Sequence, residues 1–248
     1  MVYRLVIAPP PHSQVDLTPE QIHYVKRVLR LHDGDRLVAM DGQGQSWRGR
    51  LQGQQLWLEE SLQERTELPL TVALMVALPK GNGFEEIIRP CTELGVTLFI
   101  PVLSERTLLK PSPQKCDRWQ KIAMEAAEQS ERQWVPRILE PQPLATALEQ
   151  FTNGKKYLCV TRQAAPTLYS CLIAVPPEPL VIAIGPEGGW TEAEIQQAIA
   201  LDYQPVSLGK RILRTVTAPT AALALVAALW EQDNPFTSLD EWGQNADQ

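Results

Sequence analysis

Two short segments of this 248-residue chain have residue types and spacing that could bind a ligand. The first, residues 184–189 (IGPEGG), follows an apolar run and precedes a helix that Thr191 would cap. Its adjacent glycines let the backbone approach a ligand closely or adopt positive φ. The spacing matches neither the dinucleotide fingerprint GxGxxG nor the P-loop pattern, so neither kind of site is predicted. A plain turn between a strand and a helix is the alternative interpretation.

The second segment, residues 208–214 (LGKRILR), sets three bases beside a glycine. No acid occurs between Lys210 and Glu231. Basic side chains are disfavoured at the start of a helix because the helix dipole is positive there. The position of Arg211 and Arg214 just before a predicted helix therefore favours an anionic partner, either a phosphate or a carboxylate. A solvated helix start is the alternative.

A third group of candidates lies on one predicted helix. Glu125, Glu128 and Arg132 are separated by three and four residues, so their side chains would be neighbours on one helical face. The favoured interpretation is an exposed face linked by salt bridges.

The elements that must position these segments divide the chain into two parts. Strands are predicted over residues 36–40, 46–51 and 55–59, with turn signals between them. A helix is predicted over residues 18–31, because Thr18, Pro19 and Gln21 form a capping box with proline in the first helical position. Short strands with one helix favour a small barrel or a barrel-like sheet.

After a boundary at residues 64–70, apolar runs alternate with helical patterns. The predicted strands span residues 71–78, 97–102, 157–161, 180–184 and 205–208, and the predicted helices span residues 83–94, 116–130, 166–172, 191–201 and 217–231. This alternation predicts an α/β fold with a parallel sheet covered on both faces. Ligands of such sheets bind at the C-terminal ends of the strands, where both glycine-containing segments fall.

Composition narrows the class of protein. Apolar residues make up 44% and charged residues 21% of the chain, as in ordinary globular proteins. No apolar run reaches the roughly 20 residues that a spanning helix needs, and the N-terminus lacks a signal-peptide pattern, so we expect a cytoplasmic protein. The four cysteines show no metal-ligand spacing. The net charge of −6 comes largely from an acidic C-terminal end, which leaves residues 20–50 locally basic and compatible with a polyanion.

Six motifs occur in the order and at the approximate spacing of a known family. They are LPKG (78–81), TELGV (92–96), SER (104–106), EAAEQS (125–130), IGPEGG (184–189) and LGxRILRT (208–215). Over about residues 4–230 the chain resembles ribosomal RNA small-subunit methyltransferase E, of the SPOUT superfamily. The resemblance implies a PUA-like RNA-binding domain over 1–68 and a SPOUT methyltransferase domain with a deep trefoil knot over 70–232. The charge pattern, independently of the resemblance, predicts an acidic tail over 233–248. The resemblance also implies a homodimer packed through the knot region. The apolar face of residues 217–230 is compatible with that interface or with a core inside one subunit.

The resemblance implies methyl transfer from S-adenosylmethionine, without metal, to nitrogen 3 of one uridine in 16S ribosomal RNA, on the assembled 30S particle. Arg214 and Arg132 are the candidates for stabilising the uracil anion. The candidate cofactor-binding residues are Thr161, Arg162, Ile184, Gly185, Glu187, Gly188, Gly189, Leu208, Gly209, Ile212, Leu213 and Ala218. The candidate RNA-binding residues are Lys26, Arg27, Arg30, Arg48 and Arg50. No general base is identified; Glu93 and Glu128 are possibilities that could instead hold arginines.

The chain departs from the family pattern at three positions. Lys210 stands where proline is common, Val216 where glutamate is common, and Pro90 where lysine is common. The missing carboxylate at Val216 keeps open a non-catalytic RNA-binding or ribosome-assembly factor. A SPOUT enzyme acting on another RNA, such as transfer RNA, is a third interpretation.

Overall fold

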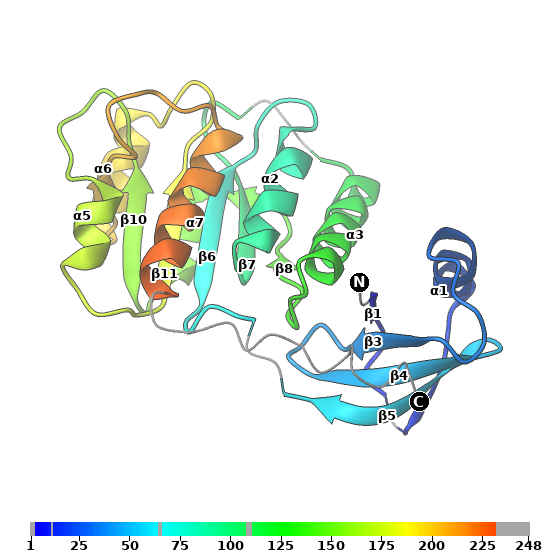
Figure 1. Cartoon of the computed structure of the whole chain (residues 1–248). Helices are drawn as coiled ribbons and strands as arrows, with labels where there is room; N and C mark the ends of the chain where they lie inside the picture. Colours follow the sequence, from blue (N-terminus) through cyan, green and yellow to red (C-terminus); the bar gives the residue numbers. More distant parts are fainter. Residues whose placement is uncertain (1–2, 11, 64–65, 108–110, 232–248) are drawn as a thin grey trace.

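The computed structural model describes residues 3–10, 12–63, 66–107 and 111–231. The predicted acidic tail lies outside these residues. Figure 1 shows a layered α/β unit joined to a smaller sheet at the N-terminal end of the chain.

The N-terminal sheet has five strands in the order β1-β3-β4-β5-β2. The strands are β1 (Arg4–Val6), β2 (Gln14–Asp16), β3 (Arg36–Met40), β4 (Ser46–Gln52) and β5 (Gln55–Leu62). The pair β1–β3 is parallel, and the other pairs are antiparallel. Strands β1 and β2 lie at the two edges, so the sheet is barrel-like and open, as one of the two sequence interpretations proposed.

The helix of this part differs from the one predicted over 18–31. Thr18 and Gln21 form the expected capping box at the start of α1 (Pro19–His23). The α-helix then widens into a π-helical turn, η1 (Tyr24–Val28), where the Leu29 N–H bonds the Tyr24 carbonyl. Arg30 adopts a φ of 59° and ends the helical segment. The prediction of one continuous α-helix to residue 31 is therefore wrong.

The second sheet is parallel throughout and runs in the order β12-β10-β11-β6-β7-β8, with β9 also pairing with β7. Its strands are β6 (Val72–Ala77), β7 (Leu98–Leu103), β8 (Arg137–Ile138), β9 (Gln142–Pro143), β10 (Lys155–Cys159), β11 (Leu180–Ile184) and β12 (Gln204–Val206). The five predicted strands and the parallel sheet are confirmed, with small shifts at the ends. Strands β8 and β9 were not predicted because two residues carry no periodicity. The trefoil knot implied by the resemblance stays a prediction.

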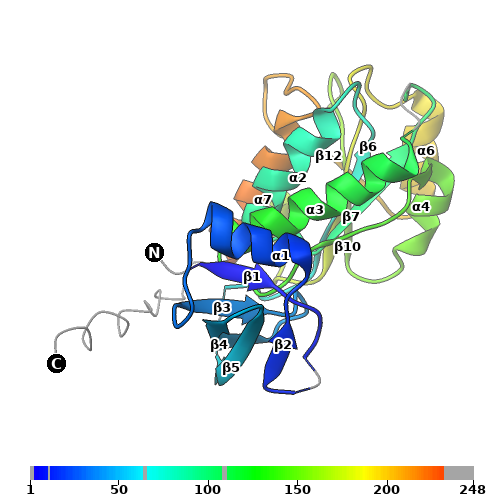
Figure 2. The same cartoon turned by 90° about the vertical axis from the view of Figure 1, so that its right-hand side faces the viewer.

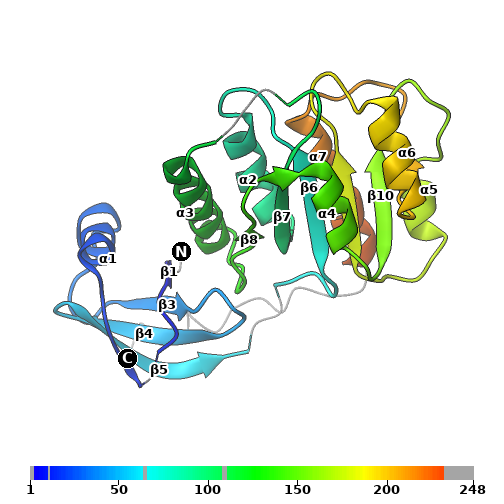
Figure 3. The same cartoon turned by 180° about the vertical axis from the view of Figure 1, so that it is seen from behind.

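Helices cover both faces of this sheet. They are α2 (Gly83–Glu93), α3 (Pro113–Gln129), α4 (Leu144–Gln150), α5 (Leu168–Ile173), α6 (Glu192–Ala200) and α7 (Thr217–Trp230). Along the buried strand β6, Val72, Leu74 and Val76 pack with the face of α2, α3, α5 and α7, which Figure 1 shows in front. Ala73 and Met75 pack with the α4 and α6 face, which Figure 3 shows from behind. Among the described helices, none combines the length and apolar content needed to cross a membrane.

The N-terminal sheet docks on the C-terminal end of α3, beside β1 (Figure 2). The Val6 N–H donates to Glu128 Oε1 over 2.7 Å, and Arg4 pairs with Glu131 at 2.9 Å. The bond from Val6 satisfies one backbone group on the free edge of β1, and the Arg4–Glu131 pair adds a contact between side chains. Burial raises the pKa of Glu128 to about 7, and the neighbouring charge of Glu125 adds to that rise.

Candidate functional site

A cavity of about 1020 Å³ opens at the C-terminal ends of the parallel strands. Its walls are the segment 79–83 after β6, segment 159–167 after β10, segment 184–190 after β11 and segment 207–218 after β12. Figure 1 shows these loops together at the end of the sheet farther from the N-terminal sheet. The position agrees with the rule that open parallel sheets bind ligands where their strands end.

The structure brings all of the candidate cofactor-binding residues to this one cavity. The residues are Thr161, Arg162, Ile184, Gly185, Glu187, Gly188, Gly189, Leu208, Gly209, Ile212, Leu213 and Ala218. The candidate catalytic residue Arg214 lines the same cavity. Segments far apart in the sequence thus share one surface, although the role of each residue stays a prediction.

Two bonds shape the IGPEGG loop. The carboxylate of Glu187 accepts the Lys80 N–H over 3.0 Å and so ties this loop to the segment after β6. The Gly189 N–H bonds the Pro186 carbonyl over 2.8 Å, which closes a turn. Gly189 has a φ of 71°, and a side chain there would project into open space. Glycine is required at this position because other residues adopt that φ only at a cost.

The second loop begins with a tight turn at Ser207 and Gly209. The Ser207 hydroxyl bonds both the N–H and the carbonyl of Gly209, at 3.0 and 3.1 Å. The loop ends where the Arg214 carbonyl accepts the N–H groups of Thr217 and Ala218 and starts α7. Between these points Ile212 is 61% exposed on the cavity wall. Such an exposed apolar side chain suits a wall that a ligand covers.

The donors and walls of the cavity fit the adenosine part of S-adenosylmethionine. Trp190 is buried on the cavity wall beside Gly185, and its indole Nε1 has no hydrogen-bond partner among the described residues. A buried donor without a partner costs free energy, which a ligand acceptor would recover. Burial raises the pKa of the Cys159 thiol to about 12, so this cavity residue stays protonated and is a poor nucleophile. The described residues contain no cluster of three or more possible metal ligands.

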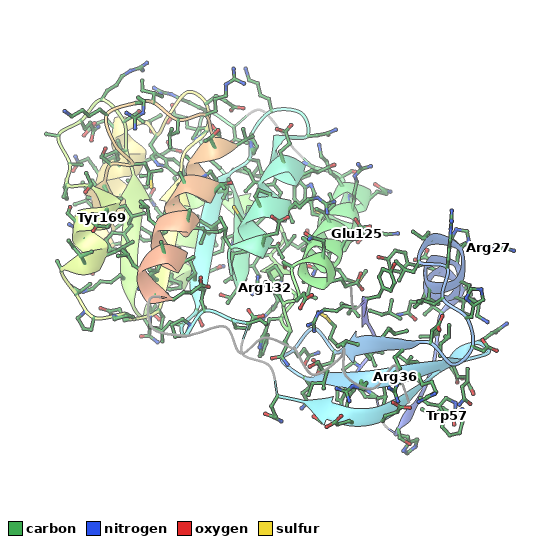
Figure 4. The ribbon with its side chains drawn as sticks, viewed as in Figure 1. Arg27, Arg36, Trp57, Glu125, Arg132 and Tyr169 are labelled. Atoms are coloured by element: carbon green, nitrogen blue, oxygen red, sulfur yellow. The ribbon has the colours of Figure 1, made fainter. Side chains whose placement is uncertain are left out.

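Arg132 does not reach this cavity, which corrects its assignment as a catalytic residue. Helix α3 ends at Gln129, and Glu131 adopts a φ of 62°, so Arg132 turns away from the helix axis. Its side chain is 2% exposed and donates to Glu67 and to the carbonyls of Thr92 and Val96. Figure 4 shows it near the end of α3 that meets the N-terminal sheet. A guanidinium buried in this way links separate segments of the chain and is not accessible to a substrate.

The prediction that Glu125, Glu128 and Arg132 form one exposed, salt-bridged face of α3 is also wrong. Glu128 lies against β1 and accepts the Val6 N–H, while Glu125 pairs with Arg89 at 3.6 Å. Neither Glu128 nor Glu93 lines the cavity, so the structure does not bring these two possible bases to the other candidate residues. Val216 does line the cavity, beside Gly83, at the position where the resemblance implies a carboxylate.

The five candidate RNA-binding residues fall into two groups. Lys26 pairs with Asp33 at 3.1 Å, Arg48 with Glu60 at 2.9 Å and Arg50 with Glu59 at 2.7 Å. Hydrogen bonding to Lys26 lowers the pKa of Asp33, and hydrogen bonding to Arg50 lowers that of Glu59. Within the described residues Arg27 and Arg30 have no ion-pair partner; Figure 4 shows Arg27 on the outer side of the helical segment. None of the five lines the cavity.

Sequence reasoning missed the residues that the LPKG and SER motifs bring to the cavity. These are Pro79 and Lys80 of LPKG and Arg106 of SER, together with Asn82, which follows LPKG directly. Both motifs were visible, and both follow strands of the predicted sheet, so their position at strand ends was the available signal.

Two family models match the chain. The RNA methyltransferase domain matches residues 66–227, and the RNA methyltransferase PUA domain matches residues 17–59. Ribosomal RNA small subunit methyltransferase E of Synechocystis sp. is 54% identical over 239 residues, which cover 93% of this chain and 79% of that protein. The chain belongs to the ribosomal RNA small subunit methyltransferase E family. The Bacillus subtilis member of this methyltransferase E family is 34% identical and covers 85% of this chain and 88% of its own length.

Solved structures share the fold. The methyltransferase E structure from Neisseria gonorrhoeae, bound to S-adenosylmethionine, matches with a TM-score of 0.85 and 32% identity over 93% of this chain and 98% of that one. A methyltransferase from Legionella pneumophila in complex with S-adenosylmethionine matches with a TM-score of 0.82 and 28% identity over 92% and 98%. The α/β sheet and the PUA-like part of this chain therefore agree with the fold that the sequence predicted.

Proposed function

We propose that this protein transfers a methyl group from S-adenosylmethionine to nitrogen 3 of a uridine in small-subunit ribosomal RNA. The observation that carries the proposal is one cavity that unites the IGPEGG loop after β11 and the LGKRILR loop after β12, two strands that both pair with β10. Family membership and cofactor-bound relatives support the same activity. The target base is inferred from the resemblance to the family.

The chain's own residues would bind and orient the cofactor. S-adenosylmethionine supplies an electrophilic methyl group on a sulfonium when it is bound. Backbone groups of the loop 185–189 would lie against the cofactor because its glycines carry no side chain, and Leu208, Ile212 and Leu213 would supply apolar walls. Residues that hold the cofactor and the uracil in a fixed mutual orientation would lower the barrier to transfer.

Arg214 is the candidate for stabilising the substrate anion. The uracil nitrogen is a poor nucleophile until it loses its proton, and the negative charge then spreads to the flanking oxygens. A guanidinium on the cavity wall, without a carboxylate partner in the described chain, is suited to that charge. The competing role is a contact with the carboxylate of the cofactor. We favour the anion role, and single-turnover kinetics of Arg214→Ala separate the two.

RNA binding and catalysis would be assigned to the two different sheets. Residues 1–68 would bind RNA and residues 70–232 would carry catalysis, with Arg27 and Arg30 as phosphate contacts. An assembled 30S particle offers a shaped target with more contacts than free RNA, so we expect it to be the preferred substrate. A ribosomal substrate is also what supports a cytoplasmic location.

A homodimer is supported by an apolar surface on α5 and α7. Ala224 and Ala228 on α7 and Tyr169 and Ile173 on α5 are exposed, and the two helices pack side by side. Figure 4 shows Tyr169 on the side of the molecule away from the N-terminal sheet. Ala228→Arg places a bulky charge on this surface and should convert the dimer to a monomer, as measured by multi-angle light scattering. The helical circular-dichroism signal should be unchanged.

The deciding experiment is methyl transfer to 30S subunits that lack the modification, followed by mass spectrometry of the nucleosides. The expected product is 3-methyluridine in small-subunit RNA. Cofactor binding without any methyl transfer would instead indicate the non-catalytic factor that the missing carboxylate at Val216 keeps open. Transfer to transfer RNA in preference to subunits would identify a different substrate.

A further inference from the structure

The lysines and arginines of this acidic protein differ in whether they form ion pairs with carboxylates. Lys80, Arg106, Arg162, Lys210, Arg211 and Arg214 line the cavity, and none of them forms an ion pair with another described residue. The acids on the cavity wall are Glu86 and Glu187, and Glu187 is bonded to the Lys80 backbone. Outside the cavity several arginines have carboxylate partners, as in Arg118 with Glu85 at 3.0 Å, although Arg27 and Arg30 have none among the described residues. Unneutralised positive charge is thus gathered at the mouth of one cavity.

The cofactor alone does not account for this charge. S-adenosylmethionine carries a single carboxylate, beside an ammonium and a sulfonium, so it needs one cationic partner at most. A polyanion that passes the cavity mouth accounts for several unpaired cations, because each backbone phosphate of RNA takes one Lys or Arg contact.

Among these cations, Arg106 lies in a turn that several hydrogen bonds hold in place. The turn follows β7, and in it the hydroxyls of Ser104 and Thr107 bond each other at 2.9 Å. The Thr107 N–H also bonds the Ser104 carbonyl over 3.0 Å. The Glu105 N–H donates to the carboxylate of Glu194 over 2.8 Å. That carboxylate also completes the capping box at the start of α6, so the turn is anchored to a helix.

The guanidinium of Arg106 reaches the IGPEGG loop. Its Nη1 donates to the Gly188 carbonyl over 2.5 Å, and the side chain is exposed. Among the described residues this carbonyl is the one acceptor for its five N–H donors, so a bidentate contact to a phosphate stays available. A Cβ on Gly188 would come within 3.1 Å of Arg106 Cδ. The glycine at 188 therefore leaves room for the arginine.

We propose that Arg106 binds a backbone phosphate of the RNA at the cavity mouth, next to the nucleotide that enters. The proposal rests on the proposed function, because it takes RNA as the substrate. It adds a phosphate contact on the methyltransferase sheet, remote from the N-terminal domain to which RNA binding was assigned. Arg106 would act together with the glycine at 188, which sets the position of its side chain.

The test compares Arg106→Ala with Arg118→Ala, which removes an exposed arginine that lies outside the cavity and is paired. Binding of unmodified 30S subunits to the full-length protein is measured at several salt concentrations. Arg106→Ala should raise the dissociation constant about 10- to 100-fold and reduce the magnitude of the log–log salt slope by about 0.7–0.9. It should raise KM for subunits more than it lowers kcat. Arg118→Ala should change neither the constant nor the slope.

Two further variants separate a phosphate contact from a general disturbance. Arg106→Lys keeps the charge, so it should restore the wild-type salt slope while binding stays weaker than wild type. Gly188→Ala should displace Arg106 and weaken subunit binding, and combining it with Arg106→Ala should add little, because both changes remove the same contact. Unchanged subunit binding and salt slope in Arg106→Ala would overturn the proposal.

Calorimetry with S-adenosylmethionine supplies the remaining control. Arg106→Ala should bind the cofactor with the wild-type constant, and a clear loss of cofactor affinity would overturn the proposal by assigning Arg106 to the cofactor. Because subunit binding is measured without turnover, a wild-type protein that binds subunits but fails to methylate them would contradict the proposed function and leave this test valid. A wild-type protein that does not bind subunits would overturn both.

Discussion

One carboxylate oxygen of Glu67 accepts two hydrogen bonds from the Arg132 guanidinium, and the other accepts the backbone N–H groups of Gln133 and Trp134. The bonds from Arg132 Nε and Nη2 are 3.0 and 2.5 Å long. Glu67 lies in the connection between the two sheets, and Arg132 follows α3. One carboxylate thus fixes the connection to the end of that helix, and the orientation of the N-terminal sheet depends on it.

Arg132→Met should destabilise the protein without affecting the cavity. Removing one partner of a buried pair leaves the other charge without compensation, which costs about 3–5 kcal/mol. Because Glu67 is partly exposed, we expect a loss near the lower end of that range in urea unfolding. The dissociation constant for S-adenosylmethionine should stay within about twofold of wild type, because the cavity is remote from this pair. A variant with wild-type stability but no methyl transfer would restore the catalytic assignment of Arg132.

Stability should fall as pH rises through the titration of Glu128. Burial raises the pKa of this carboxyl from 4.5 to about 7, so the folded state holds a proton that the unfolded state releases. Between these two values the free energy of unfolding decreases with pH, by up to about 3 kcal/mol in total. Glu128→Gln removes the titration. In urea unfolding it should match wild type at a pH near the unfolded pKa and exceed it above the folded pKa.

The groups around Glu128 bear on that experiment. Glu125 on α3 adds repulsion, Tyr24 on η1 has its own pKa raised by burial and by both carboxylates, and the Val6 N–H donates to Glu128. A glutamine oxygen can still accept the Val6 N–H. Parallel pH profiles for Glu128→Gln and wild type would show that another group controls the dependence.

Gly189→Val should weaken cofactor binding, and Gly53→Val is its matched control. The two glycines have φ values of 71° and 63°, and a Cβ added to either would meet no atom within 4 Å. Each variant should lose about 1–3 kcal/mol of stability from backbone strain. Gly189 lines the cavity, whereas Gly53 lies between β4 and β5. Only Gly189→Val should raise the dissociation constant for S-adenosylmethionine, by about tenfold or more in calorimetry.

Arg214→Ala should lower the single-turnover rate about 100-fold at saturating cofactor and subunit, because a donor that stabilises developing charge in the transition state has an effect of this order. Cofactor affinity should change little, whereas loss of a carboxylate contact would raise the dissociation constant instead. Arg214→Lys should recover only part of the rate, because an ammonium lacks the planar two-pronged contact. A wild-type single-turnover rate in Arg214→Ala would exclude the catalytic role.

The arginines of the N-terminal domain should differ in their effect on RNA binding. Replacing Arg27 and Arg30 together by alanine should weaken subunit binding and reduce its salt dependence. Replacing Arg48 and Arg50 should have a smaller effect, because Glu60 and Glu59 already neutralise them. Filter binding over a range of salt concentrations measures both pairs. Equal losses in the two double variants would mean that the carboxylates release their arginines when RNA binds.

Local signals were enough to predict much of the fold and of the cavity. The capping box of Thr18 and the helix cap at Thr191 form as their sequences predict. The glycine loops meet because the C-terminal ends of parallel strands share one edge of a sheet. That rule links segments far apart in the sequence without knowledge of any contact.

Other features depend on tertiary contacts that periodicity does not carry. Arg132 continues the helical spacing of α3, but the helix ends at Gln129 and Glu131 reverses the chain direction. Its partner Glu67 lies 65 residues away in the sequence. The widening of the first helix at Tyr24 and the contact of Arg106 with Gly188 likewise arise between elements, so no local pattern announces them.

The docking of β1 on α3 has a consequence for the order of folding during synthesis. The Val6 N–H is satisfied by Glu128, which follows it by 122 residues. At about 5–20 residues per second, that carboxylate is made roughly 6–25 s after Val6. During this interval the edge of the first sheet is without this partner. In a nascent chain, the hydrogen bond that completes the edge of β1 can therefore form only after the middle of the protein has been synthesised.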